Sequence, residues 1–347
     1  MHPQILSLVT EVPEFRLRTD DVIAEATRIF AGRHQDFERL MPVFANTGIV
    51  NRYSVRPYDW FREEQGWPER SQAYIEGASK LFRKASIRAL LEAHAEPAEI
   101  DAIITVSSTG IATPSIEARV MHDLGFREDV SRIPIFGLGC AGGVTGLSVA
   151  SRMAHSAPQY KVLLVVIELC TLAFRPDEMT KSNIIATALF GDGAAACVLS
   201  SNSKNGIGAI EHAGEHTWPG TLDIMGWRMD PLGFGAIFSQ RIPELATRDL
   251  RPAADRFLER HDLDADDIGQ FVFHPGGAKV IVALEQAFNL EQGLLQNERQ
   301  VLAGYGNMSA PTVLFVLDQA LRQPFSGRRF LSALGPGFTA SFLTMLC

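Results

Sequence analysis

Helix-like and strand-like spacings of hydrophobic residues alternate along the chain. Residues 71–94 place apolar side chains three and four positions apart, which predicts a helix with one buried face. Residues 161–169 hold a run rich in Val and Ile, which is typical of a strand in a sheet covered on both faces. Residues 211–239 contain several Gly and Pro without a clear spacing, so we expect loops there.

These segments predict an α/β fold. We expect helices over residues 21–44, 71–94, 115–124, 243–261, 278–288 and 311–321, and strands over residues 100–107, 132–137, 161–169, 271–274, 328–334 and 339–346. Because helices and apolar strands are interleaved, the sheet should be buried between layers of helices.

Short segments in the two halves of the chain resemble each other and occur in the same order. Residues 137–140 (GLGC) and 304–307 (GYGN) each open a predicted helix, and residues 188–199 are similar to residues 333–346. The repeated order predicts two duplicated halves, residues 1–205 and 206–347. A polar run near residues 200–208 is typical of a surface connection between them.

The composition is that of an ordinary folded protein, since 46% of its 347 residues are hydrophobic and 21% are charged. This apolar content excludes a disordered chain. The four cysteines are too few and too scattered for a disulfide-framed module. The net charge of -8 argues against nucleic acid or an anionic membrane as a partner. We find no signal-peptide pattern and no apolar run near the ~20 residues that span a bilayer, so we expect a cytoplasmic protein with reduced thiols.

Cys140 is a candidate nucleophile. It lies between a predicted strand and a glycine-rich helix start, where the positive end of the helix dipole favours a thiolate. The flanking glycines allow a ligand to approach closely. The alternative is a buried structural cysteine, which is the better interpretation for Cys170 and Cys197 in their apolar segments.

His274 and Asn307 could complete a site with Cys140. His274 ends a predicted strand and precedes Pro-Gly-Gly, so its ring should point into a loop-lined cavity unless it is an ordinary turn histidine. Asn307, at a predicted helix start, could offer its amide to a developing oxyanion or act as an N-cap. If the halves are related by a pseudo-twofold axis, Cys140 and Asn307 can face one cavity. No histidine pair has zinc-ligand spacing, so we expect no metal.

Five motifs occur in a specific order along the chain: GLGCAGG at residues 137–143, LFGDGAAA at 189–196, HPGG at 274–277, GYGNMS at 304–309 and GPG at 335–337. In these motifs the sequence resembles the type III polyketide synthases, the chalcone synthase-like branch of the thiolase superfamily. The resemblance runs from about residue 103 to the C-terminus and more loosely through the N-terminal helices. It implies a thiolase-like fold of five αβαβα layers with two duplicated halves, and a homodimer.

The resemblance also implies roles for the candidate residues. Cys140 would carry the acyl group, while His274 and Asn307 would hold the thioester oxygen of malonyl-CoA as CO2 leaves. Phe190 would act as an active-site gate that excludes water. The amide of Cys140 and the loop of Gly335, Pro336 and Gly337 would form the oxyanion hole, and Ser309 would contact substrate. Acyl-CoA and malonyl-CoA are the implied substrates, and no further cofactor is expected.

Four residues fall at cavity-lining positions of the family: Thr109, Thr113, Cys170 and Ala173. Thr113 and Ala173 are smaller than the Met and Thr usual in plant chalcone synthases, and the volume that they leave unfilled would open an acyl tunnel, as in bacterial alkylpyrone and alkylresorcinol synthases. We therefore expect a medium- or long-chain acyl-CoA starter, two or three extensions, and closure to a pyrone or resorcinol.

Residues 39–52 correspond to a region where plant relatives carry several basic residues that bind coenzyme A phosphates. Pro42 and Asn46 depart from that pattern. The remaining candidates for phosphate contact are Arg39, Arg52, Arg56 and, just after HPGG, Lys279.

Three alternative functions stay open at this stage. An initiating ketoacyl carrier-protein synthase shares the Cys, His and Asn but usually has His-Gln-Ala-Asn in place of HPGG, and it adds one ketide unit. A Cys-His-Asn thioester hydrolase would release free acid. A non-catalytic dimer partner is disfavoured because all three residues are present.

Overall fold

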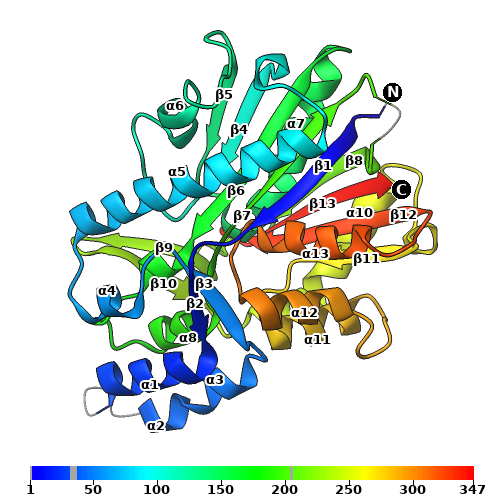
Figure 1. Cartoon of the computed structure of the whole chain (residues 1–347). Helices are drawn as coiled ribbons and strands as arrows, with labels where there is room; N and C mark the ends of the chain where they lie inside the picture. Colours follow the sequence, from blue (N-terminus) through cyan, green and yellow to red (C-terminus); the bar gives the residue numbers. More distant parts are fainter. Residues whose placement is uncertain (1, 32–36, 204–205) are drawn as a thin grey trace.

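The computed structural model describes residues 2–31, 37–203 and 206–347 (Figure 1). Within these residues one sheet follows the strand order β11-β12-β13-β8-β1-β7-β6-β4-β5. Its strands are β1 (Gln4–Glu11), β4 (Ala102–Val106), β5 (Ser131–Ile135), β6 (Lys161–Leu169), β7 (Asp192–Ser200), β8 (Gly208–Thr217), β11 (Gln270–Phe273), β12 (Arg328–Gly335) and β13 (Thr339–Leu346).

The sheet consists of two similar parts that meet at a short seam. β1 and β8 pair only through Gln4–Ala209 and Ile5–Gly208. In the first part, β4 and β6 are parallel, and β6–β7 and β7–β1 are antiparallel pairs. In the second part, β11 and β12 are parallel, and β12–β13 and β13–β8 are antiparallel pairs. This repeated order agrees with the predicted duplication. The exact boundary stays a prediction, because residues 204–205 of the predicted connection lie outside the described residues.

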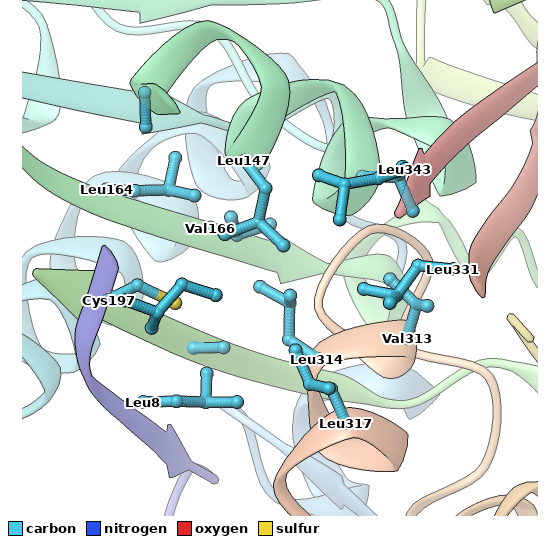
Figure 2. Packing of buried hydrophobic residues seen from close by; sticks show 14 of the residues in the cluster. Leu8, Leu147, Leu164, Val166, Cys197, Val313, Leu314, Leu317, Leu331 and Leu343 are labelled. Atoms are coloured by element: carbon cyan, nitrogen blue, oxygen red, sulfur yellow. The ribbon is translucent and has the colours of Figure 1, made fainter. Parts of the chain in front are cut away.

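Two central helices pack between the two parts of the sheet, on the side away from the outer helices. α7 (Gly142–Ser156) and α13 (Thr312–Leu321) share one core with strands from both parts. Figure 2 shows Leu147 of α7 and Leu314 of α13 between Leu164 and Leu331. α5 (Trp67–Glu92) covers the outer face of the first part, and α10 (Arg251–Glu259) with α11 (Ala278–Ala287) covers the second. These are the five predicted layers.

Further elements lie around these layers. They are β2 (Phe15–Arg18), β3 (Asn51–Ser54), α1 (Thr19–Phe30), α2 (Phe37–Leu40), α3 (Pro42–Asn46), α4 (Tyr58–Arg62), α6 (Ile116–Val120), α8 (Lys181–Leu189), α9 (Ile242–Leu245) and α12 (Gln296–Tyr305). Cys140 lies in a single 3₁₀ turn (Gly139–Ala141), and another (Cys170–Ala173) follows β6. No helix among the described residues is long and apolar enough to cross a membrane.

Most predicted elements are present, with two corrections. The expectation of loops over residues 211–239 was wrong, because β8 continues to Thr217 and β9 (Met225–Asp230) pairs with β10 (Gly233–Phe238) as a hairpin. The single helix predicted over residues 21–44 is divided into α1, α2 and α3, and its residues 32–36 lie outside the described part. Pro42, at the first position of α3, lacks the amide that a continuous helix needs.

Candidate active site

Cys140 lies immediately before the central helix α7, as the sequence predicts. The Oγ atom of Ser108 accepts hydrogen bonds from the amides of Gly137 and Gly139, both at 3.1 Å, and so holds the turn that presents the thiol. Gly139 has a φ of +48°. A Cβ atom there would lie 2.6 Å from Cδ of Pro336, so the sharp turn and the close contact both require glycine.

Glycines also bring the Asn307 segment close to Cys140. A Cβ atom on Gly143 of α7 would lie 2.3 Å from the carbonyl oxygen of Ala310, which precedes α13.

Asn307 is not an N-cap, which corrects one sequence interpretation, because it follows α12 and α13 begins only at Thr312. The side chain of Asn307 instead donates to the carbonyl of Gly276 (3.1 Å) and accepts from the amide of Ser309 (2.8 Å).

His274 is presented at the end of β11, as predicted. Its amide donates to the carbonyl of Ser332 on the neighbouring strand at 2.9 Å. The side chain is buried, yet neither ring nitrogen has a hydrogen-bond partner among the described residues, which argues against the turn-histidine alternative. A buried ring with both nitrogens unpaired is costly for a structural residue and suitable for a residue that binds a ligand.

The three residues converge on one cavity, here called the catalytic cavity. Its empty space is about 440 Å³, part of it open to solvent. Besides Cys140, His274 and Asn307, its wall is mostly apolar: Met225, Phe238, Ile242, Leu250, Val280, Leu284, Ala333 and Leu334, with Gly276 and Ser332. Sequence reasoning missed Met225 and Phe238, because they come from the hairpin in the stretch expected to be loops.

The electrostatics of this cavity favour uncharged groups. Burial raises the pKa of the Cys140 thiol to about 12, although a hydrogen bond with Ser309 lowers it. Burial also lowers the pKa of His274 to about 3. The resting pair is therefore a neutral thiol and a neutral imidazole, whereas the helix dipole alone had led us to expect a thiolate.

Phe190 directly follows α8 and lies between the Asn307 segment and a second pocket. Its backbone forms an isolated parallel bridge with Asn307. The second pocket, here called the apolar pocket, has about 640 Å³ of empty space, part of it open to solvent. Phe190, Cys170 and Ala173 line it together with α1 and α4, and their predicted contact with substrate stays a prediction.

The two predicted threonines differ in position. Thr109 is buried, and its hydroxyl donates to Oε2 of Glu168 at 2.8 Å. Burial raises the pKa of Glu168 to about 8, and its Oε1 atom has no partner among the described residues. Sequence analysis did not single out this carboxyl, although its place within the apolar run of residues 161–169 could have marked it. Thr113 is exposed, and neither threonine lines the two pockets within this chain, so neither lies where a cavity-lining residue was expected.

The loop of Gly335, Pro336 and Gly337 lies against the Cys140 turn. A Cβ atom on Gly335 would lie 2.6 Å from the carbonyl oxygen of Leu138 and 2.9 Å from the amide nitrogen of Ala141. Pro336 contacts Gly139. The loop is therefore close enough to the Cys140 turn to help shape an oxyanion hole. Pro336 itself cannot donate a hydrogen bond there, because its backbone nitrogen carries no hydrogen.

The four basic candidates for coenzyme A phosphates do not form one cluster. Arg52 is buried and donates to the carbonyls of Thr187 and Phe190, which removes it from the set. Arg56 forms an ion pair with Glu76 at 2.5 Å beside α5. Arg39 lies on α2, and Lys279 is exposed in the first turn of α11, directly after HPGG.

Two family profiles match this chain. The profile of chalcone and stilbene synthases, N-terminal domain, matches residues 63–203, and that of the C-terminal domain matches residues 210–343. Together the two profiles match most of the chain from residue 63 onward.

Individual relatives match over nearly the whole length. A Bacillus subtilis (strain 168) protein with a provisional chalcone synthase name is 38% identical and covers 98% of this chain and 97% of its own. The 1,3,6,8-tetrahydroxynaphthalene synthase of Streptomyces peucetius subsp. caesius is 33% identical over 98% of this chain and 92% of its own. The solved structure of the 1,3,6,8-tetrahydroxynaphthalene synthase of Streptomyces coelicolor A3(2), a bacterial type III polyketide synthase, has a TM-score of 0.94 at 27% identity and covers 99% of both chains.

Proposed function

The chain belongs to the chalcone and stilbene synthase family, and on that premise we propose that it loads an acyl-CoA starter on Cys140 and extends it with malonyl-CoA. The family comprises type III polyketide synthases, which are acyltransferases that catalyse a decarboxylating condensation. The observation that carries the proposal is the convergence of Cys140, His274 and Asn307 on one apolar cavity with both nitrogens of His274 unpaired.

Loading begins from the neutral pair. As the sulfur of Cys140 attacks the starter thioester, neutral His274 accepts the thiol proton and then returns it to the departing coenzyme A thiolate. The amides at the start of α7 stabilise the tetrahedral oxyanion. The product is an acyl thioester on Cys140 and free coenzyme A.

Extension uses the same residues in a different role. His274 and the second amide hydrogen of Asn307 bind the thioester oxygen of malonyl-CoA, since only one hydrogen of that amide is taken by Gly276. Loss of CO2 leaves an enolate, which attacks the acyl carbonyl on Cys140 and releases the thiolate. The apolar wall of the catalytic cavity excludes water that would protonate the enolate or hydrolyse the thioester. Phe190, which lines the apolar pocket, is assigned the same role on that side.

The starter is proposed to be a medium- or long-chain acyl group, and the product a pyrone or resorcinol. The support is the apolar pocket, where Cys170 and Ala173 are small and α1 contributes Val22, Ala26 and Ile29. The test is turnover of acetyl- to palmitoyl-CoA with malonyl-CoA, followed by product mass spectrometry. Exclusive use of a short or aromatic starter would refute this starter class.

Product mass also separates the alternative functions. Several added ketide units support a polyketide synthase, a single added unit supports a ketoacyl synthase, and free acid without a new carbon–carbon bond supports a hydrolase.

A second candidate product is a tetrahydroxynaphthalene. It is favoured by the name of a relative that is 33% identical over nearly the whole chain. A naphthalene skeleton contains ten carbons, so it requires five two-carbon units and no long starter. Incubation with malonyl-CoA alone distinguishes the two products, because only the second candidate yields its full product without an added acyl-CoA.

We propose further that the enzyme is a homodimer. β5 is the last strand of the sheet, and the strand and the segments beside it expose Ile111 (51%) and Phe136 (50%). An exposed sheet edge with large apolar side chains is suited to pairing with a second copy. Sedimentation equilibrium tests this, and a monomer at micromolar concentration would contradict it.

A further inference from the structure

A buried carboxyl that sequence analysis did not single out holds the strand that ends at His274. Glu298 lies in the first turn of α12, is 2% exposed, and accepts a hydrogen bond from the amide of Phe273 at 3.0 Å. Phe273 is the last residue of β11, which is an edge strand of the described sheet. The amide of His274 points to β12, so that of Phe273 points to the open edge, where Glu298 takes the place of a neighbouring strand.

The same helix leads to the other side chain that we assign to the thioester oxygen. Its hydrogen bonding continues to the amide of Gly306, at 2.9 Å, and Asn307 is the next residue. Asn307 in turn donates to the carbonyl of Gly276, two residues after His274. The segments that carry His274 and Asn307 are therefore joined at two places, by the carboxyl of Glu298 before these residues and by the Asn307 amide at the site.

A separate ion pair fixes α12 against α11, the helix that follows HPGG and lies beside it (Figure 1). Nη1 and Nη2 of Arg299 donate to the two carboxylate oxygens of the buried Glu285, at 2.7 and 2.9 Å. Glu285 also accepts hydrogen bonds from the amides of Gly293 and Leu295, at 3.0 and 3.2 Å, in the connection between the two helices. Loss of the bond to Phe273 would therefore leave α12 in place and free the end of β11.

Burial makes Glu298 a costly partner for a single amide. It forms no ion pair within the described part of the chain, where the adjacent Arg299 binds Glu285 instead, and burial raises the pKa of Glu298 to about 7. An acidic residue that served only the helix dipole would be favourable while exposed to solvent. The burial therefore indicates that the position of the carboxyl matters more than its charge.

We propose that Glu298 is a positioning residue that sets the placement of His274 relative to Asn307 by joining the end of β11 to α12. The inference rests on the proposed function, in which these two side chains together bind the thioester oxygen of malonyl-CoA. Glu298 does not line the catalytic cavity, so it acts through the backbone of β11. Two donors to one developing oxyanion must converge on the same point, and a misplacement of about 1 Å can lower a rate about 10²-fold.

The test compares two neutral variants with side chains of similar length, Glu298→Gln and Glu298→Met. Glutamine keeps an oxygen that accepts from the Phe273 amide, whereas methionine fills the same space with only a weak acceptor. In the release of ¹⁴CO2 from labelled malonyl-CoA, Glu298→Met should lower kcat about tenfold or more and change KM less than about twofold, the pattern of a loss confined to the transition state. Glu298→Gln should stay within about threefold of wild type, because the hydrogen bond is kept. Equal kcat values in the two variants would overturn the proposal.

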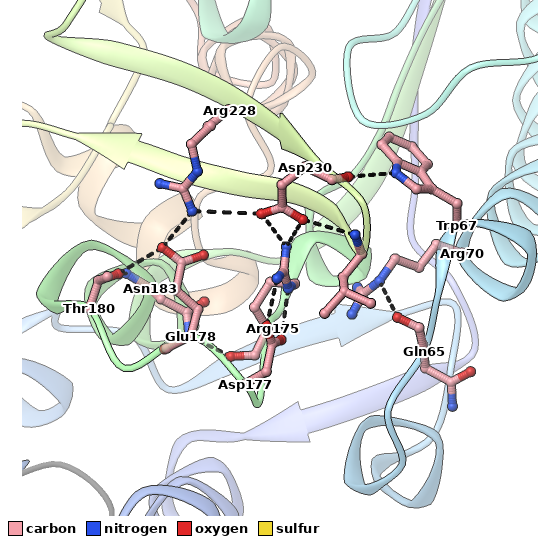
Figure 3. A network of polar contacts seen from close by, with 11 residues as sticks. Gln65, Trp67, Arg70, Arg175, Asp177, Glu178, Thr180, Asn183, Arg228 and Asp230 are labelled. Carbon is pink, nitrogen blue, oxygen red and sulfur yellow. Dashed lines mark hydrogen bonds and ion pairs between the residues drawn. The ribbon is translucent and has the colours of Figure 1, made fainter.

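The matched control breaks a buried polar network in another part of the molecule (Figure 3). Asp230, at the end of β9, accepts from Nη1 of the buried Arg175 at 2.7 and 2.8 Å, and its carbonyl accepts from the indole of Trp67 at 2.7 Å. None of these residues belongs to β11 or α12. Asp230→Asn should lower the urea midpoint and change the kcat of decarboxylation less than about twofold. If it lowers kcat as much as Glu298→Met does, the effect is general loosening and the positioning role is wrong.

A second variant and a second measurement cover the case in which Glu298→Met does not fold. Glu298→Asp withdraws the acceptor by one methylene group, so its kcat should fall below that of Glu298→Gln. Hydrogen exchange of the peptide at residues 270–277, followed by mass spectrometry, should be faster in Glu298→Asp and Glu298→Met and unchanged in Glu298→Gln and Asp230→Asn. Unchanged exchange in the aspartate and methionine variants would show that the carboxyl does not hold the end of β11.

Failure of the proposed function gives a different result. A wild type that releases no CO2 from malonyl-CoA refutes the proposed extension step, and hydrogen exchange then decides whether Glu298 holds β11. A wild type that releases CO2 at the same rate as Glu298→Met supports the extension step and refutes the positioning role.

Discussion

Phe190 and Asn307 are joined through their backbones. The amide of Asn307 donates to the carbonyl of Leu189 at 2.9 Å, and the amide of Gly191 donates to the carbonyl of Asn307 at 3.0 Å. Phe190, which we assign as the gate, and the Asn307 amide, which we assign to the thioester oxygen, are therefore held in one hydrogen-bonded backbone unit. Any movement of the gate must occur in the Phe190 side chain, because the backbone is held from both sides and by Arg52.

Asn307→Ala should lower the rate of malonyl-CoA decarboxylation by about 10²- to 10³-fold, the usual effect of losing one oxyanion donor. The contrasting variant is Cys140→Ala, which should lose starter loading but retain decarboxylation, since His274 and Asn307 remain. Release of ¹⁴CO2 from labelled malonyl-CoA measures both. Unchanged decarboxylation in Asn307→Ala would show that its amide does not bind the thioester oxygen.

The resting thiol of Cys140 should react slowly with iodoacetamide at neutral pH. Because burial raises its pKa to about 12, the thiolate fraction and the alkylation rate should increase about tenfold per pH unit between pH 6 and 9. Peptide mass mapping measures the rate at Cys140, with Cys140→Ser as the background for the other cysteines. A rate that is already constant near pH 6 would instead reveal a thiolate–imidazolium pair.

The stability of the Glu168→Gln variant relative to wild type should be greater at alkaline pH than at acidic pH. Burial raises the pKa of Glu168 from 4.5 to about 8, so the folded protein holds this proton more tightly than the unfolded chain does. Its contribution to stability is complete below pH 4.5 and is lost as the pH rises to about 8, whereas glutamine keeps the neutral form throughout. Urea unfolding of both proteins at pH 5 and pH 8 measures this, and an equal difference in unfolding free energy at both values would contradict the assignment.

Gly139→Ala should be more damaging than Gly137→Ala. Both glycines have positive φ, at +48° and +94°, so alanine costs roughly 1–2 kcal/mol of backbone strain at either position. Only at residue 139 would the new Cβ meet Pro336, at 2.6 Å, whereas nothing lies within 4 Å at residue 137. We expect a lower condensation rate and a lower urea midpoint for Gly139→Ala. Equal effects of the two variants would mean that the Pro336 loop moves away without cost.

Local patterns in the sequence were sufficient for most elements of the two halves, and the ordered motifs singled out Cys140, His274 and Asn307, which the structure brings to one cavity. The apolar runs that become β6 and β13 and the amphipathic spacing of α5 are local properties, so they predict structure without knowledge of neighbours. The hairpin of β9 and β10 was missed because its strands are short and Gly-rich, and their pairing depends on Arg175 and Trp67 from distant parts of the chain.

Tertiary structure alone decided the ionisation and the surroundings of the site. The sequence places Cys140 at a helix start, which suggests a thiolate, but only the packing of the two halves shows that desolvation outweighs this effect and leaves a neutral thiol. Arg52 was a sequence-based candidate for contact with a coenzyme A phosphate, yet folding buries it and directs its guanidinium to the carbonyl of Phe190. The charge state and the partners of a side chain depend on what is packed around it, and residues far apart in the sequence supply that packing.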